Sequence, residues 1–209
     1  MIDHPFRPLT IAIYLGLLLV AMVVVVQLPQ LDFIAAWQDP NAAVTVSTFQ
    51  FISDSISYFS FGIPVTIAVV REFNSAPDKK RSRLSLLYIL VSIAVAGLIS
   101  YAMKKTFSEP RPYEVDSRIT QLSVGGGYSL PSGHTTEAFA SAMAIILLFP
   151  RWFAIIPLFC WASAVALSRI YLGVHYPFDI LVGAFLGSSS ALGFYFFVFR
   201  KHLQAKTVH

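Results

Sequence analysis

Long runs of apolar residues restrict this chain more than any other feature of its sequence. A helix needs about 20 such residues to cross a bilayer. Only 12% of the residues are charged, whereas a soluble domain is typically about 25% charged. We therefore expect an all-α protein, a six-transmembrane helical bundle that forms a single domain over residues 1–209. The six runs are Leu9–Gln27, Ile56–Val70, Leu84–Met103, His134–Phe149, Trp152–Ser168 and Pro177–Phe199.

Two of the runs are short for a membrane span. Ile56–Val70 and His134–Phe149 need flanking residues, or burial against other helices, to reach across the bilayer. The segment Asp32–Ser55 precedes the first of them and mixes aromatic with polar residues. An interfacial helix on the outer leaflet and a plain loop both fit that pattern.

Basic residues gather at one end of the expected bundle. Arg71–Arg83 holds five lysines and arginines, Arg151 lies in the turn after the fourth run, and the C-terminal tail adds more. The segment Leu28–Ser55 has three aspartates and no lysine or arginine. The positive-inside rule makes the basic end cytoplasmic. The loops Lys104–Pro131 and Arg169–Tyr176 then face outward, although they carry cations of their own.

Three polar clusters lie on this outward side. They read KKTFSEPRP from Lys104 to Pro112, PSGH from Pro131 to His134, and SRIYLGVHYPFD from Ser168 to Asp179. A charged group at membrane depth costs about 2.5 to 3.5 kcal/mol, so several together indicate a functional site. Arginine and lysine both suit phosphate oxygens, the first as a rigid fork and the second as a movable charge. An anion that binds all three clusters would explain them.

The PSGH segment starts an apolar run directly after a loop with three glycines. The first amides of a helix are unpaired and its N-terminus is partially positive, which favours anion binding. Gly133 allows the backbone to come close to a ligand, and the hydroxyl of Ser132 can donate a hydrogen bond. The sequence therefore predicts a phosphate site at this helix N-terminus.

Two histidines are candidates for covalent and proton chemistry. His134 and His175 can each act as nucleophile or as acid near neutral pH. Asp179 follows His175 by four residues and can accept a hydrogen bond from one ring nitrogen. The other nitrogen then stays free to attack, as in a catalytic triad that uses histidine as its nucleophile.

Together the three clusters resemble the type 2 phosphatidic acid phosphatase superfamily of integral-membrane lipid phosphatases. Its signatures K-x6-R-P, P-S-G-H and S-R-x5-H-x3-D all match, in order, within a core at residues 84–199. The resemblance implies a metal-independent phosphatase with a phosphohistidine intermediate. His175 would attack, Asp179 would orient it, and His134 would protonate the leaving oxygen. The residues that would hold the phosphoryl oxygens are Lys104, Arg111, Ser132, Gly133 and Arg169.

The resemblance also implies the substrate class and the location. The substrate would be a membrane lipid phosphate: phosphatidylglycerophosphate, phosphatidic acid or undecaprenyl diphosphate. No cofactor, metal or nucleic acid is implied, and the oligomeric state is unknown. The small size and short tails are typical of a bacterial inner (cytoplasmic) membrane protein, whose active site would face the periplasm or the cell exterior.

Other functions fit part of the pattern. A lipid A phosphatase or a lipid phosphotransferase would carry the same three motifs. Anion channels and lipid transporters also place basic residues in broken helices, but no inverted repeat is visible in the sequence, and a nucleophile with an orienting carboxylate has no role in a pore. A catalytically silent relative would be expected to lack one of the residues His134, His175 and Asp179.

Overall fold

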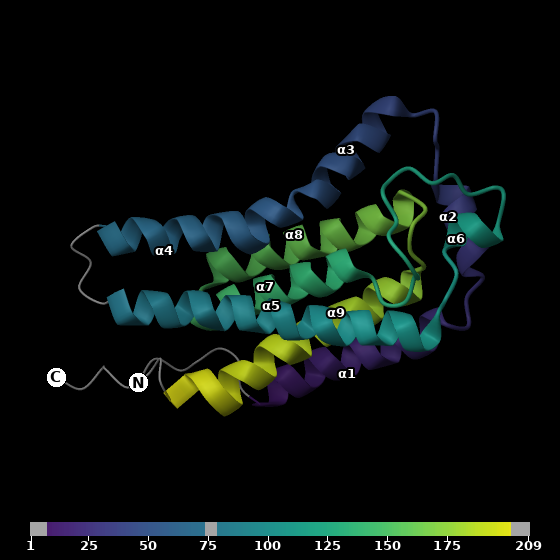
Figure 1. Ribbon diagram of the computed structural model, residues 1–209. Helices are drawn as coiled ribbons and strands as arrows, with labels where there is room; N and C mark the ends of the chain where they lie inside the picture. The colour runs from purple at the N-terminus through teal and green to yellow at the C-terminus, as the bar shows by residue number, and fades with distance from the viewer. Residues whose placement is uncertain (1–7, 74–78, 202–209) are drawn as a thin grey trace.

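The computed structural model describes residues 8–73 and 79–201, and within these ranges every regular element is helical (Figure 1). Two short segments, η1 and η2, have the wider π-helical pattern. The elements in chain order are α1 (Pro8–Val25), α2 (Gln30–Trp37), α3 (Ala43–Asp54), η1 (Tyr58–Gly62), α4 (Ile63–Phe73), α5 (Lys79–Phe107), α6 (Pro112–Val115), α7 (Gly133–Leu148), α8 (Trp152–Tyr171), α9 (Pro177–Phe194) and η2 (Tyr195–Phe199).

The predicted all-α membrane fold is confirmed, with a difference in the number of full-length spans. In the described part of the chain, five helical segments are long and apolar enough to cross a membrane. The fourth expected run, His134–Phe149, forms α7, which has 16 residues. At a rise of about 1.5 Å per residue it is roughly 24 Å long, less than the hydrocarbon thickness of about 30 Å.

The second span begins earlier than predicted. Helix α3 continues through η1 into α4, so this span runs from Ala43 to Val70 rather than from Ile56. The loop interpretation of Asp32–Ser55 is therefore wrong, because α2 and α3 make up most of that segment. Because α3 contains polar residues, a search for runs of apolar residues misses this part of the span. One of them, Ser53, is fully buried against α8.

Helix α7 lies at the centre of the bundle and packs against α5, α8 and α9. Eleven of its 16 residues are buried, which explains how a short helix is kept out of lipid. Its closest neighbour is α9, where Gly183 and Gly187 face α7. A Cβ atom at Gly183 would lie 2.9 Å from the carbonyl oxygen of Ser132, and one at Gly187 would lie 2.8 Å from the backbone nitrogen of Ala140. These glycines let the two backbones approach closely, as small residues do in membrane helix pairs.

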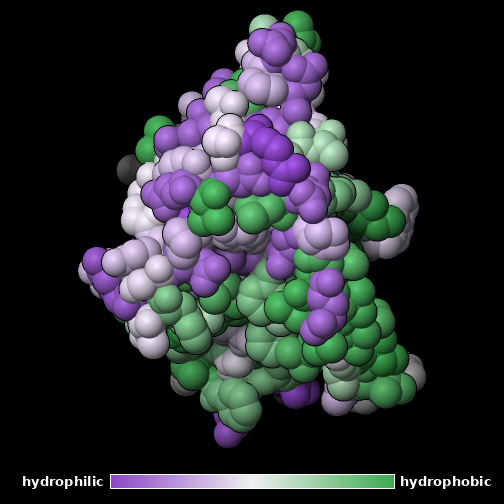
Figure 2. Space-filling model, turned by 90° about the vertical axis from the view of Figure 1, so that its right-hand side faces the viewer, coloured by the Kyte–Doolittle hydropathy of each residue, from purple (hydrophilic) through white to green (hydrophobic). Residues whose placement is uncertain are grey.

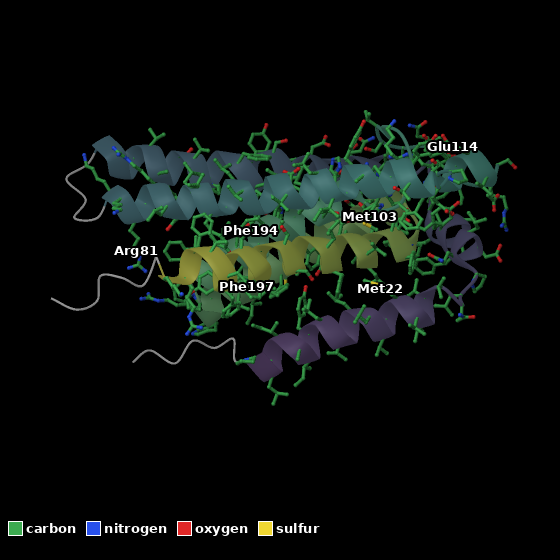
Figure 3. The ribbon with its side chains drawn as sticks, turned by 60° about the horizontal axis from the view of Figure 1, so that its bottom comes forward. Met22, Arg81, Met103, Glu114, Phe194 and Phe197 are labelled. Atoms are coloured by element: carbon green, nitrogen blue, oxygen red, sulfur yellow. The ribbon has the colours of Figure 1, made fainter. Side chains whose placement is uncertain are left out.

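Helix α1 lies at the edge of the bundle, against α9 (Figure 3). None of its residues is buried, so most of its apolar surface is available to lipid. One polar contact joins the two helices: the hydroxyl oxygens of Tyr14 and Ser188 are 2.8 Å apart.

The two ends of the bundle differ in character. Arg81 lies near one end and Glu114 at the other (Figure 3). The second end carries α2, α6 and the long α6–α7 connection. Seen from this end, hydrophilic residues gather over the upper part of the face and apolar residues over the lower part (Figure 2). All three polar clusters of the sequence lie toward this end.

Aromatic rings and one buried amide fasten α2 and α3 to the rest of this end. The ring of Tyr171 stacks on Phe49 with centroids 4.3 Å apart and meets Trp37 edge-on at 5.5 Å. The Gln38 side chain donates to the carbonyl oxygens of Thr120 and Tyr171 and accepts from the backbone N–H of Thr120. These contacts hold the loop that follows α6 over the end of α8.

Candidate active site

The sequence-predicted site residues come together at the hydrophilic end of the bundle, each at or near the end of a helix. Lys104 lies in the last turn of α5 and Arg111 precedes α6. Ser132, Gly133 and His134 start α7. Arg169 lies in the last turn of α8. His175 lies between α8 and α9, and Asp179 lies in the first turn of α9.

His175 and Asp179 form a buried pair. Each is 2% exposed, and His175 Nδ1 lies 3.1 Å from Asp179 Oδ2. The same oxygen accepts hydrogen bonds from the Tyr176 backbone N–H at 3.0 Å and from the Ser129 hydroxyl at 2.5 Å. An oxygen that accepts from two other donors is an acceptor toward the imidazole too. The proton of a neutral His175 therefore belongs on Nδ1, which leaves a lone pair on Nε2.

Burial keeps the His175 ring neutral. It lowers the pKa of His175 to about 4, although the hydrogen bond with Asp179 acts in the opposite direction. Arg111 Nη1 lies 3.4 Å from Nε2 and adds positive charge beside the ring, which also disfavours protonation. The free nitrogen thus faces a guanidinium group, which is the environment expected around a phosphorus atom under attack.

Arg111 joins the first cluster to the third. Its guanidinium group donates to the carbonyl oxygens of Gly126, Gly127 and Val174 at 3.0, 2.9 and 2.7 Å. The residue is 3% exposed. The glycine-rich loop thus wraps the Arg111 side chain, and Val174 directly precedes His175. This network fixes the guanidinium plane beside the nucleophile candidate.

Arg169 is almost fully buried as well, with 2% exposure. Nη1 donates to the hydroxyls of Ser53 and Ser123 at 2.5 and 3.1 Å, and Nη2 donates to the Val124 carbonyl at 3.2 Å. Its Nε is buried without a hydrogen-bond partner among the described residues. A buried unpaired donor is costly, and a phosphate oxygen is a suitable acceptor for it.

Helix α7 begins within the PSGH segment, at Gly133. Ser132 is the N-cap: it is fully buried, and its oxygen accepts from the Thr135 hydroxyl at 2.9 Å. Nothing lies within 4 Å of the position that a Cβ atom on Gly133 would occupy, so the first helical amides can be approached closely. His134 is half-buried, and its charged surroundings include Arg169, Arg111 and Lys104.

Lys104 binds the backbone of the loop that precedes the PSGH segment. Its ammonium group donates to the carbonyl oxygens of Tyr128 and Ser129 at 2.6 and 3.0 Å. Three cations therefore surround the start of α7. Helix amides, guanidinium groups and an ammonium group are the groups that bind anions in proteins.

Three serines with site contacts were not expected from the sequence. Ser53 and Ser123 hold Arg169, and Ser129 bonds to Asp179. Only the position of Ser129, two residues before Pro131, could have drawn attention to it. The carboxylate of Glu114 also contacts this region: it accepts from the backbone N–H of Arg111 at 2.7 Å.

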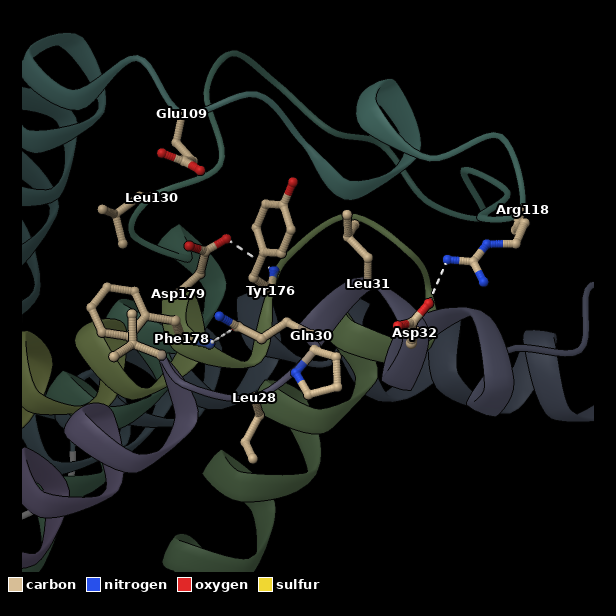
Figure 4. A pocket seen from close by; sticks show the side chains of 12 residues that line it. Leu28, Gln30, Leu31, Asp32, Glu109, Arg118, Leu130, Tyr176, Phe178 and Asp179 are labelled. Carbon is tan, nitrogen blue, oxygen red and sulfur yellow. Dashed lines mark hydrogen bonds and ion pairs between the residues drawn. The ribbon is translucent and has the colours of Figure 1, made fainter.

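A pocket of about 560 Å³ lies next to Asp179, between the α1–α2 link and the start of α9 (Figure 4). Leu28, Leu130 and Phe178 line one part of it, and Gln30 and Glu109 line another. The Gln30 side chain accepts from the backbone N–H of Phe178 at 2.9 Å. The acidic residues at this pocket disfavour a second phosphate there, so the cationic site is the one suited to an anion.

The described residues contain no group of three or more histidine, cysteine, aspartate or glutamate side chains arranged to hold a metal ion. The charge available to neutralise a bound phosphate in this part of the chain comes from Lys104, Arg111 and Arg169.

Membrane-spanning helices that gather cations and histidines at one end of the bundle define an integral-membrane protein. The chain belongs to the PAP2 superfamily, whose profile matches residues 85–203. This confirms the family indicated by the three motifs.

Three comparisons place the chain within this family. It is 34% identical over 137 residues to a lipid A 4'-phosphatase of Bacteroides thetaiotaomicron, covering 54% of this chain and 60% of the relative. It is 35% identical over 122 residues to an undecaprenyl-diphosphatase of Bacillus subtilis, covering 57% and 60%. The chain thus spans less than two thirds of these relatives. A transmembrane PAP2-type phosphatidylglycerolphosphate phosphatase from Bacillus subtilis shares the fold, with a TM-score of 0.67, 22% identity, and coverage of 87% of this chain and 94% of that one.

Proposed function

We propose that this chain is an integral-membrane lipid phosphatase that hydrolyses a lipid phosphate monoester or diphosphate through a phosphohistidine intermediate. The observation that carries the proposal is the position of His175. It is buried and neutral, its Nδ1 is held by Asp179, and its Nε2 faces the guanidinium group of Arg111. A nucleophile, an orienting carboxylate and a phosphate-neutralising cation are thereby aligned.

In the first step, His175 Nε2 attacks phosphorus and the bond from phosphorus to the lipid oxygen breaks. His134 donates a proton to that leaving oxygen, and the lipid departs as an alcohol or a shorter phosphate. Asp179 stabilises the positive charge on the imidazole through the proton on Nδ1. Phosphoryl transfer depends mainly on positioning and charge, which Lys104, Arg111 and Arg169 supply.

In the second step, water attacks phosphorus and the nitrogen–phosphorus bond breaks. His134, now unprotonated, accepts a proton from this water. Inorganic phosphate is released, and both histidines return to their starting states. Ser132 and the first amides of α7 hold the phosphoryl oxygens throughout both steps.

The proposed substrate is a lipid whose chains remain in the bilayer while its phosphate reaches the site sideways from the outer leaflet. The relatives act, by their names, on lipid A and undecaprenyl diphosphate, and the structural neighbour acts on phosphatidylglycerolphosphate. The deciding experiment measures phosphate release by purified protein in detergent from these three lipids, phosphatidic acid and a soluble phosphate ester. His175→Ala is assayed beside the wild type.

A lipid that the wild type hydrolyses and the variant leaves intact would support both the class and the substrate. Hydrolysis of the soluble ester alone would argue against a lipid substrate. If no phosphate is released but labelled phosphate moves from one lipid to another, the enzyme is a phosphotransferase.

The proposed chemistry needs no metal ion, because three side chains provide the positive charge. We expect full activity in excess EDTA, and inhibition by vanadate, which adopts the five-coordinate geometry of phosphorus in transfer. A magnesium-dependent phosphatase assayed in parallel verifies that chelation is complete. Activity that EDTA abolishes and magnesium restores would contradict the metal-independent mechanism.

We further propose that the site faces the periplasm or the cell exterior of a bacterial cytoplasmic membrane. The test uses a protein without its single cysteine, Cys160→Ser, into which Gly126→Cys or Lys80→Cys is introduced. Gly126 lies in the loop over the site with open space around its Cα, and Lys80 is exposed at the start of α5. An impermeant thiol reagent should label Gly126→Cys in intact cells and Lys80→Cys only after permeabilisation. The reverse pattern would overturn this orientation.

A further inference from the structure

The geometry assigns to Ser129 the role of a positioning residue: its hydroxyl donates to the Asp179 carboxylate and holds it where it accepts from His175 Nδ1. This inference rests on the proposed function, since it concerns how the nucleophile is oriented. It adds a residue outside the three sequence signatures, because Ser129 lies two positions before Pro131.

Ser129 is fully buried and lies at the junction of Asp179 and His175. Its hydroxyl donates to Asp179 Oδ2 at 2.5 Å, and the same oxygen atom lies 3.4 Å from His175 Nδ1. The hydroxyl proton is engaged with the carboxylate, so Ser129 offers His175 only an acceptor. Both neighbours of Nδ1 are then acceptors, which favours the proton on Nδ1 and the lone pair on Nε2.

The position of Ser129 is itself fixed by the backbone around it. Its N–H donates to the Glu109 carbonyl at 2.8 Å, and its carbonyl accepts from Lys104 Nζ at 3.0 Å. A residue that binds a phosphate-site lysine on one side and the orienting carboxylate on the other couples the two. A movement of Lys104 toward a phosphate oxygen would therefore also move Ser129, and with it the Asp179 carboxylate.

Asp179 has one other anchor on the same oxygen, the Tyr176 backbone N–H at 3.0 Å. That bond lies within the α9 N-terminus and follows any movement of this helix. Within the described part of the chain, Ser129 is the donor to this carboxylate from outside the His175–Asp179 segment. Removing it leaves the carboxylate free to turn away from Nδ1 without unfolding α9.

The test measures the rate at which the phosphohistidine forms in single-turnover experiments, together with steady-state kcat and KM. The variants are Ser129→Ala, Ser129→Thr, which keeps a hydroxyl, and Ser129→Cys, which keeps the size with a weaker donor. Ser188→Ala is the matched control, because Ser188 is equally buried but bonds to Tyr14 instead. Each Ser→Ala change is also combined with Asp179→Asn.

We expect Ser129→Ala to lower kcat and the rate of phosphohistidine formation by about 10- to 100-fold, with little change in KM. Ser129→Thr should recover most of the loss and Ser129→Cys should not. In the Asp179→Asn background, Ser129→Ala should have almost no further effect, because residues that act as a unit are not additive. Ser188→Ala should leave the rates unchanged.

Wild-type rates in folded Ser129→Ala would overturn the assignment, and so would a full additional loss in the Asp179→Asn background. If Ser129→Ala does not fold, the comparison of threonine with cysteine decides: cysteine rates equal to wild type would contradict the role. Absence of phosphate release by the wild type itself from every lipid would instead refute the proposed function, and is seen without any variant.

Discussion

Replacing His175 by alanine should lower kcat for lipid phosphate hydrolysis by at least about 10⁴-fold, since loss of a nucleophile removes the covalent route entirely. The imidazole lies between Asp179 and Arg111, and no other histidine is held by a carboxylate in the described part of the chain. The variant should remain folded, because the α7–α9 packing does not depend on this side chain.

The measurement is phosphate release together with trapping of labelled protein in a denaturing quench at alkaline pH. Wild type should yield a phosphorylated species that is labile in acid and stable in alkali, as expected for a nitrogen–phosphorus bond, and His175→Ala should yield none. His175→Asn, which can still hydrogen-bond to Asp179, serves as the second variant. Recovery of activity in His175→Asn would mean that the residue is structural rather than the nucleophile.

Changing Asp179 to asparagine should lower kcat by about 10² to 10⁴-fold with little loss of stability. The amide is nearly the same size, but its NH₂ group can donate to Nδ1 and so place the histidine proton on Nε2. The lone pair needed for attack is then lost. The negative charge that stabilises a phosphorylated imidazole is lost as well.

The matched control is Asp116→Asn, the same change at the end of α6. Asp116 accepts from the Arg118 side chain rather than from a histidine. We expect Asp116→Asn to hydrolyse lipid phosphate at the wild-type rate. Equal losses in the two variants would argue against a specific orienting role for Asp179.

Sequence analysis could predict the parts of the site whose residues lie close together in the chain. His175 and Asp179 are four residues apart, so they meet as soon as α9 begins at Pro177. The start of α7 at Gly133 likewise depends on local features, a capping serine before an apolar run.

The parts that could not be predicted depend on contacts between distant segments. Ser53 meets Arg169 across 116 positions, and Ser129 meets Asp179 across 50. A buried serine has no sequence signature of its own, because serine is equally common in loops and helix caps. Only the packing of α3 on α8, and of the loop before α7 on α9, makes these hydroxyls part of the site.

The second span was predicted too short for a related reason. Polar residues in Ala43–Asp54 lower the hydropathy of this helix, yet two of them bond to other parts of the protein: Ser53 to the side chain of Arg169 and Gln50 to the carbonyl oxygen of Leu122. A count of apolar residues along the sequence cannot distinguish a polar residue that packs against α8 from one that is exposed to solvent. The same count found α7 but gave no sign that it lies at the centre of the bundle.

The burial of the two arginines also affects how the site would respond to salt. Arg111 and Arg169 are almost fully buried, and the carbonyl oxygens of Gly126 and Gly127 cover the guanidinium group of Arg111. Mobile ions screen surface charges within about 8 to 10 Å but reach buried ones far less. The attraction between this site and a phosphate should therefore persist at ionic strengths that weaken phosphate binding by surface arginines. An outward-facing enzyme built this way would keep its affinity when the salinity of the surrounding medium changes.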